Sequence, residues 1–242
     1  MLDIRQNVEG VQAAIERACR RCGRDPREVL LIAVSKTVDL ERIRLAVEAG
    51  VPALGENRVQ EAKEKVATLG HPVPWHLIGS LQTNKARDAA RIFDCVQSVD
   101  RLELAHEMDR RAQAAGRVVD GLLQVNLGEE PQKGGLPPAE VKAVLDQVAA
   151  LPGLRIRGLM AIPPLVPDAE AARPYFRRLR ELRDAVGLEH LSMGMSGDFE
   201  VAIDEGATMV RVGTAIFGPR QGPGLGRPPG GSPESGAGVS QR

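Results

Sequence analysis

The stretch Val29-Leu30-Leu31-Ile32-Ala33-Val34-Ser35-Lys36 combines a long apolar run with a lysine at its end. Six consecutive aliphatic residues lead through a serine into a lysine, which predicts a strand buried on both faces, as in a parallel sheet. Lysine is costly to bury, and only six of the 32 Lys and Arg residues are lysines. In an apolar pocket a lysine can lose its proton and become a nucleophilic amine. The plainer alternative is that Lys36 lies just past the strand and reaches water.

Composition sets the class of protein. With 242 residues, 43% hydrophobic and 26% charged, the chain is expected to be a soluble globular protein with a full core. A formal net charge of zero and 2% aromatic residues argue against a nucleic-acid partner. No apolar run approaches the ~20 residues that span a membrane, and the N-terminus lacks a signal-peptide pattern, so we expect a cytoplasmic protein. The pair Cys19 and Cys22 has no second pair at zinc-binding spacing, so no metal site is predicted.

One unit recurs along the chain, a short apolar strand followed by a helix. Strands are predicted at residues 29–36, 53–56, 75–79, 93–99, 121–127, 155–162, 190–195 and 208–212. Such alternation requires a parallel sheet with right-handed crossovers, and eight units predict a single (β/α)8 barrel of the TIM type over residues 1–220. An open doubly wound sheet is the alternative, but it would usually carry a Gly-rich turn after its first strand. Residues 221–242 are rich in Gly, Pro and Ser, and we expect a disordered tail.

A barrel of this type carries its site at the C-terminal ends of the strands. Lys36 follows the first strand. The loops after the seventh and eighth strands, a usual place for phosphate, hold Ser196 and the pair Gly213-Thr214. Gly213 lets backbone N–H groups approach a phosphate, and Ser196 and Thr214 offer hydroxyl donors. Each feature alone is typical of an ordinary turn or helix cap, but their combination favours a phosphate site.

A phosphate site across the barrel mouth from a lysine points to pyridoxal 5'-phosphate (PLP), whose aldehyde condenses with lysine. Arg211, on the eighth strand, would face the pyridine nitrogen and keep it unprotonated. The competing interpretation of Arg211 is a structural ion pair with Glu200, Asp204 or Glu205. His76 lies within an apolar strand, and we expect a hydrogen-bonded core histidine there in preference to a catalytic base.

Five segments also carry a family resemblance, namely residues 33–36, 55–61, 75–85, 192–198 and 210–218. Together they resemble the YggS/PROSC family, the pyridoxal phosphate homeostasis proteins, over about residues 3–220. The resemblance implies a barrel similar to the N-terminal domain of alanine racemase, with a Schiff base between Lys36 and PLP. It further implies that the cofactor is contacted by the phosphate-binding residues Ser196, Gly213 and Thr214, by Arg211 at the ring nitrogen, and by Asn57 nearby.

The function that the resemblance implies is intracellular PLP homeostasis, in which the protein holds the cofactor and delivers it to apo forms of PLP-dependent enzymes. No catalytic residue is assigned. A racemase of this barrel type needs a second base, normally a tyrosine from a further domain, and the only tyrosine here, Tyr175, is predicted on the outer helices. We therefore expect a carrier, and we separately expect a monomer. The alternative is a PLP-dependent enzyme with weak amino-acid racemase or transaminase-like activity, and a third class is a Schiff-base aldolase that uses no PLP.

Overall fold

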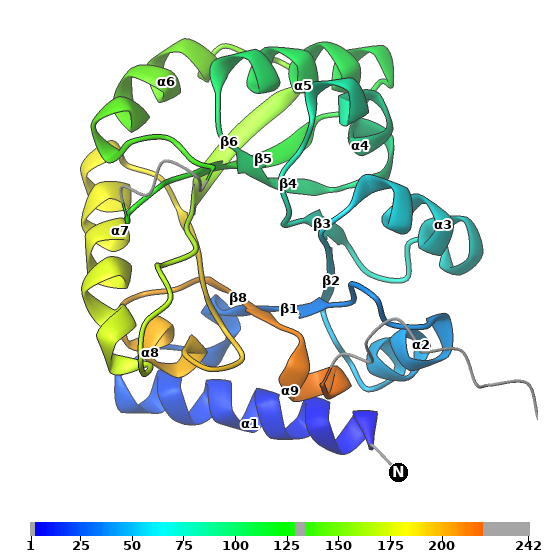
Figure 1. The fold of residues 1–242 in the computed structure, drawn as a ribbon, viewed down its shortest axis with the longest axis vertical. Coiled ribbons are helices and arrows are strands. Elements are labelled where there is room, and N and C mark those ends of the chain that lie inside the picture. Colours follow the sequence, from blue (N-terminus) through cyan, green and yellow to red (C-terminus); the bar gives the residue numbers. More distant parts are fainter. Residues whose placement is uncertain (1–2, 129–133, 220–242) are drawn as a thin grey trace, which may run out of the picture.

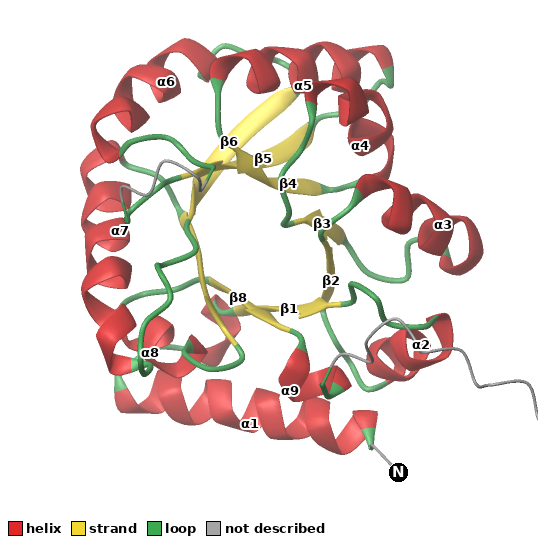
Figure 2. Ribbon diagram, viewed as in Figure 1, coloured by secondary structure: helices red, strands yellow, loops and turns green. Residues whose placement is uncertain are grey.

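Eight parallel strands close into a barrel that is surrounded by helices (Figures 1 and 2). The computed structural model describes residues 3–128 and 134–219. Each strand pairs with the next in chain order, and the last pairs with the first. The predicted (β/α)8 barrel is therefore confirmed, and the open sheet is excluded because it would have two free edges. The predicted tail, residues 221–242, lies outside the described residues.

The strand and helix bounds follow the predicted alternation. The strands are β1 (Leu30–Val34), β2 (Ala53–Glu56), β3 (Trp75–Leu77), β4 (Cys95–Val99), β5 (Val119–Gln124), β6 (Leu154–Met160), β7 (His190–Met195) and β8 (Met209–Val212). The helices are α1 (Ile4–Arg21), α2 (Leu40–Glu48), α3 (Val59–Leu69), α4 (Ala86–Ile92), α5 (Leu102–Ala114), α6 (Val141–Val148), α7 (Arg173–Val186), α8 (Phe199–Asp204) and α9 (Thr214–Phe217). None of the helices in these two described stretches is long and apolar enough to cross a membrane.

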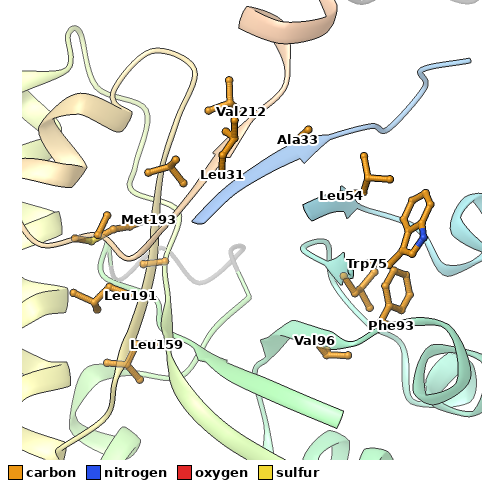
Figure 3. Close-up of a cluster of buried hydrophobic side chains, with 14 of the residues drawn as sticks. Leu31, Ala33, Leu54, Trp75, Phe93, Val96, Leu159, Leu191, Met193 and Val212 are labelled. Atoms are coloured by element: carbon orange, nitrogen blue, oxygen red, sulfur yellow. The ribbon is translucent and has the colours of Figure 1, made fainter. Parts of the chain in front are cut away.

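Side chains on the strands alternate between the barrel interior and the helix layer, except where the β4/β5, β5/β6 and β7/β8 pairs shift register. The interior cluster consists of Ile32, Ala53, Cys95, Leu122, Met160 and Met209. Their neighbours on the strands, among them Leu31, Leu54 and Val96, face outward and join the large cluster between strands and helices (Figure 3). On β1 the even-numbered residues therefore point inward. Continued past the strand, this alternation places Lys36 on the inner side of the wall.

Helix α1 supports the end of the barrel that carries the last two loops. Its buried residues Ile4, Val8, Val11, Ile15 and Ala18 form an apolar stripe along one face. Asp3 caps its first turn by accepting a hydrogen bond from the Gln6 amide at 3.1 Å. The helix packs against α8 and α9 (Figure 1), and the Asn7 side chain donates to the Ile216 carbonyl at 2.8 Å. The first helix thereby fixes the segment that follows β8.

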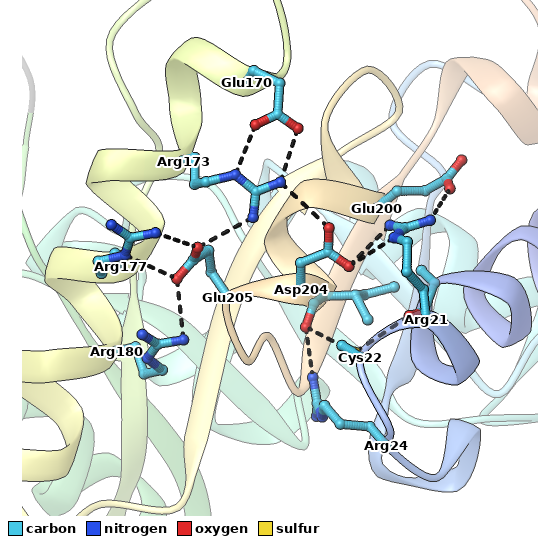
Figure 4. A network of polar contacts seen from close by, with 12 residues as sticks. Arg21, Cys22, Arg24, Glu170, Arg173, Arg177, Arg180, Glu200, Asp204 and Glu205 are labelled. Atoms are coloured by element: carbon cyan, nitrogen blue, oxygen red, sulfur yellow. Dashed lines mark hydrogen bonds and ion pairs between the residues drawn. The ribbon is translucent and has the colours of Figure 1, made fainter.

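An ion-pair network joins α1, α7 and α8 on the outside of the barrel (Figure 4). Its most buried member is Glu205, which is 4% exposed. This carboxylate is paired with three guanidinium groups of α7, those of Arg173, Arg177 and Arg180. Arg21 of α1 pairs with Asp204 at 2.9 Å. Because a buried carboxylate is costly unless it is paired, these arginines account for its position.

Candidate functional site

All six residues predicted for cofactor binding line one pocket of about 440 Å³ at the C-terminal ends of the strands. They are Lys36, Asn57, Ser196, Arg211, Gly213 and Thr214. They come from the segments after β1, β2 and β7, from β8 itself, and from the segment after β8. Residues that are far apart in the sequence therefore meet at the barrel mouth.

Lys36 lies two residues beyond the end of β1, which is shorter than the predicted strand. It is half-buried and lines the pocket together with the apolar side chains of Val34 and Ile78. The plainer alternative was thus right about the strand end, but the side chain borders a partly apolar cavity. A lysine in such surroundings is a candidate nucleophile.

The loops after β7 and β8 meet around the Ser196 hydroxyl. Its Oγ accepts hydrogen bonds from the backbone N–H groups of Gly213 at 3.3 Å and Ala215 at 3.4 Å. A Cβ at Gly213 would lie 3.4 Å from both the carbonyl oxygen and the Cβ of Val34, which is ordinary van der Waals contact, so the loop packs against the end of β1 here. Thr214 lies at the exposed rim. Converging N–H groups beside a hydroxyl form an arrangement that suits an anion such as phosphate.

Arg211 points into the barrel and is 4% exposed. Its guanidinium donates to the Ser192 carbonyl at 2.8 Å, the Ser192 hydroxyl at 2.6 Å and the Ala161 carbonyl at 2.9 Å. Burial lowers the pKa of Arg211 to about 10, and Asp198 only partly opposes this effect. Within residues 3–128 and 134–219 it forms no ion pair. The floor of the pocket therefore carries a cation whose hydrogen-bond acceptors are all neutral.

The alternative interpretation of Arg211, an ion pair with Glu200, Asp204 or Glu205, is wrong. Those three carboxylates lie on the outside of the barrel and pair with arginines of α1 and α7 (Figure 4). The physical reason is the alternation along β8, which turns Arg211 inward. Sequence alone does not fix that orientation, because it depends on the register of the closed sheet.

A layer of buried polar side chains supports Arg211 from inside the barrel. The Ser192 hydroxyl donates to Gln97 Oε1 at 2.6 Å, and Gln97 Nε2 contacts His76 Nδ1 at 2.9 Å. Because an amide nitrogen can only donate, Nδ1 is the acceptor and His76 is neutral. Burial lowers the pKa of His76 to about 4. The prediction of a hydrogen-bonded core histidine is confirmed.

Asn57 is placed by an unusually close backbone contact. A Cβ built on Gly79 would lie 2.3 Å from the Asn57 carbonyl oxygen and 2.7 Å from its Cα. No side chain fits in that space, so glycine is required where the segment after β3 passes the segment after β2. This contact holds Asn57 at the pocket wall beside Lys36.

Sequence reasoning missed a buried lysine close to the site. Lys65 of α3 is 6% exposed, and its ammonium group contacts the carboxylates of Glu56 and Glu61. The sequence does contain a signal, because Ala62, Lys65 and Leu69 share the spacing of a buried helix face. The largely polar composition of the helix obscured this signal.

Comparison with known proteins relates the chain to one family. Residues 7–221 match the family model described as alanine racemase, N-terminal domain. The chain is 45% identical to the pyridoxal phosphate homeostasis protein of Aquifex aeolicus, and the match covers 89% of this chain and 98% of that protein. Identity to the pyridoxal phosphate homeostasis protein of Escherichia coli K12 is 42%, covering 91% and 98%.

Solved structures give the same relationship. PipY of Synechococcus elongatus, determined with PLP bound, is 43% identical with a TM-score of 0.74, covering 85% of this chain and 100% of that chain. An alanine racemase from Clostridium difficile shares the fold with a TM-score of 0.70 at 15% identity, covering 92% of this chain and 58% of that chain. The chain therefore belongs to the family of pyridoxal phosphate homeostasis proteins, which resembles the N-terminal barrel of alanine racemase.

Proposed function

We propose that this protein binds PLP in the pocket at the barrel mouth, with Lys36 as its covalent anchor, and acts in PLP homeostasis as a carrier. One observation carries the proposal. A single cavity contains a half-buried lysine, a buried guanidinium without an ion pair among the described residues, and a hydroxyl that accepts two backbone N–H bonds. PLP matches these three features with an aldehyde, a ring nitrogen and a phosphate. The PLP-bound structure of PipY supports the same ligand.

The residues of the phosphate end fit a dianion. Ser196 Oγ and the N–H groups of Gly213 and Ala215 lie within one hydrogen-bonded cluster, and Thr214 adds a hydroxyl at the rim. Arg211 adds a buried positive charge to the same cavity. Charge-assisted hydrogen bonds to an anion are about twice as strong as neutral ones. The pocket therefore selects an anionic ligand.

At the other end of the pocket, Lys36 carries the covalent chemistry. Its neutral amine condenses with the aldehyde, forming a Schiff base C=N bond while the aldehyde oxygen leaves as water. Bound PLP supplies an electrophilic carbon and an electron sink. Arg211 donates hydrogen bonds, so it would hold the ring nitrogen as an unprotonated acceptor, which weakens that sink. Asn57 borders the same space.

A carrier is favoured over an enzyme by the position of the only tyrosine. Tyr175 packs in the layer between barrel and helices as part of α7, away from the residues that line the pocket. It is therefore not placed to act as a second base. The alternative function, a weak amino-acid racemase or transaminase-like enzyme, would need another proton-transferring group at the mouth. Apo forms of PLP-dependent enzymes are the recipients that a carrier would serve.

The deciding experiment compares transfer with turnover. The protein is loaded with PLP, freed of excess cofactor, and mixed with an apo form of a PLP-dependent enzyme whose recovery of activity is followed. In parallel, the loaded protein is incubated with L-alanine in D2O, and deuterium at Cα is measured by mass spectrometry. We expect transfer to the apo-enzyme and negligible exchange. Steady exchange at enzyme-like rates, or racemised alanine, would overturn the carrier in favour of the enzyme.

A further inference from the structure

The ends of β1 and β2 present different side chains to the two faces of the barrel wall. Val34 of β1 lies opposite Gly55 of β2, so Ser35 and Glu56 come next on the two strands. Lys36 and Asn57, one residue further on, line the pocket. Ser35 and Glu56 are fully buried on the other face, against the helix layer. Whatever fixes these two residues also fixes the backbone that presents Lys36.

A buried hydrogen-bond network occupies that outer face, and Lys65 of α3 lies at its centre. Its Nζ lies 2.6 Å from Glu56 Oε1, 2.6 Å from the Ser35 carbonyl oxygen and 2.7 Å from Glu61 Oε1. The Ser35 hydroxyl donates to the same Glu56 oxygen at 2.6 Å. These three acceptors match the three donors of an ammonium group. Lys65 is thus bound to the backbone of the residue immediately before Lys36.

The residue immediately after Lys36 belongs to the same network. The Thr37 amide donates to Glu61 Oε1 at 2.5 Å, the oxygen that Lys65 also contacts. Thr37 has a φ of 61°, and within the described residues it alone among non-glycine residues has a positive φ. That conformation is unfavourable for a β-branched side chain and persists only where surrounding contacts hold it. The bond to Glu61 is such a contact.

We propose that Lys65, held between Glu56 and Glu61, is a positioning residue that fixes the backbone on both sides of Lys36 and so directs the Lys36 amine at the bound aldehyde. The two lysines have separate roles. Lys65 is enclosed by oxygen acceptors behind the wall, while Lys36 borders the cavity. This inference rests on the proposed function, because it concerns the condensation of Lys36 with PLP. Glu56 makes its hydrogen bonds through Oε1 alone, and its Oε2 has no partner among the described residues.

The test separates covalent from non-covalent binding. Lys65→Met combined with Glu56→Gln removes the two buried charges together. Only Glu61, whose side chain is 25% exposed, then loses its ammonium partner. Pyridoxine 5'-phosphate, which has the ring and the phosphate but no aldehyde, measures non-covalent affinity by calorimetry. Borohydride trapping after mixing with PLP measures the rate of bond formation. Lys63→Met is the matched control, because Lys63 also lies on α3 but is 54% exposed and pairs with Asp88 on the surface.

We expect the double variant to bind pyridoxine 5'-phosphate nearly as well as the unchanged protein does. Trapping of PLP should slow on the order of tenfold to a hundredfold, because misplacing a reacting group by about 1 Å has an effect of this size. Hydrogen–deuterium exchange of the peptide around Thr37 should also increase without any ligand. Unchanged trapping, or a loss of affinity for pyridoxine 5'-phosphate as large as the slowing of trapping, would overturn the positioning role. If the double variant does not fold, Glu61→Gln, which alters the contact with Thr37 at a half-buried side chain, is judged by the same readouts. If the unchanged protein forms no bond with PLP, the proposed function itself fails.

Discussion

His76 makes the stability of the barrel depend on pH in a way that can be calculated. In the folded protein burial lowers its pKa from 6.5 to about 4, while the carboxylates of Asp94 and Asp120 only partly oppose that shift. In the unfolded chain the imidazole titrates at its ordinary pKa. Between these two pKa values the unfolded state binds more protons than the folded state does. The contribution of His76 to the free energy of unfolding is therefore complete above about pH 6.5 and is lost as the pH falls towards about 4. Integrated from pH 7 to pH 5, the loss from this one group is about 2 kcal/mol.

The structure also indicates what protonation would do to the site. A proton on Nδ1 would face the amide nitrogen of Gln97, which is itself a donor. Turning the amide over would place its nitrogen against the Ser192 hydroxyl, which now donates to Gln97 Oε1 and accepts from Arg211. The hydroxyl would then lose its acceptor. Protonation of His76 therefore disturbs the layer that supports Arg211.

The assay is urea unfolding of the unchanged protein and of His76→Asn at pH 7, 6 and 5. Asparagine keeps an acceptor oxygen near the position of Nδ1 but does not titrate. All other titrating groups are common to both proteins, so the difference between their pH dependences isolates His76. We expect the unchanged protein to lose about 2 kcal/mol more than the variant between pH 7 and pH 5. Equal losses in the two proteins would show that His76 does not cause this pH dependence.

Three further changes test the pocket wall, the phosphate end of the pocket and the C-terminal tail. Gly79→Ala places a Cβ 2.3 Å from the Asn57 carbonyl oxygen. This overlap should lower the free energy of unfolding by about 1–3 kcal/mol and weaken PLP binding. The control is Gly10→Ala, where nothing lies within 4 Å of the added Cβ and the fold should not be destabilised. Ser196→Ala should weaken binding of pyridoxine 5'-phosphate by about tenfold or more in calorimetry, because a hydrogen bond to a charged group contributes about 1.5–3 kcal/mol. An unchanged affinity would exclude Ser196 from the phosphate site. Deleting residues 222–242 should leave PLP affinity unchanged in an absorbance titration, because their composition offers almost no apolar surface, and a large loss would show that the tail contributes to binding.

Much of the site could be predicted from the sequence because it lies at strand ends. Once eight strand–helix units are recognised, the barrel rule alone places Lys36, Ser196 and the pair Gly213-Thr214 at one mouth. That prediction needs only chain order and apolar runs, not side-chain detail. The structure then brings all six predicted residues into one pocket.

The polar layers could not be predicted in the same way. The contacts from Arg211 through Ser192 and Gln97 to His76 cross the barrel between β8, β7, β4 and β3, and they depend on the register of the closed sheet. From the sequence, the Arg211 side chain could therefore point outward and form an ion pair as easily as point inward and donate hydrogen bonds. Lys65 was missed for a related reason. Its ion pair with Glu56 depends on how α3 packs against the barrel wall, which the sequence does not specify.

Covalent anchoring of PLP by Lys36 is tested most directly by identifying the lysine that the cofactor modifies. The purified protein is mixed with PLP, reduced with borohydride, digested and mapped by mass spectrometry. We expect a yellow protein before reduction and the cofactor mass on the peptide that contains Lys36, with no adduct on Lys65. A protein that takes up PLP but carries no adduct at Lys36, or one that takes up no PLP at all, would contradict this expectation.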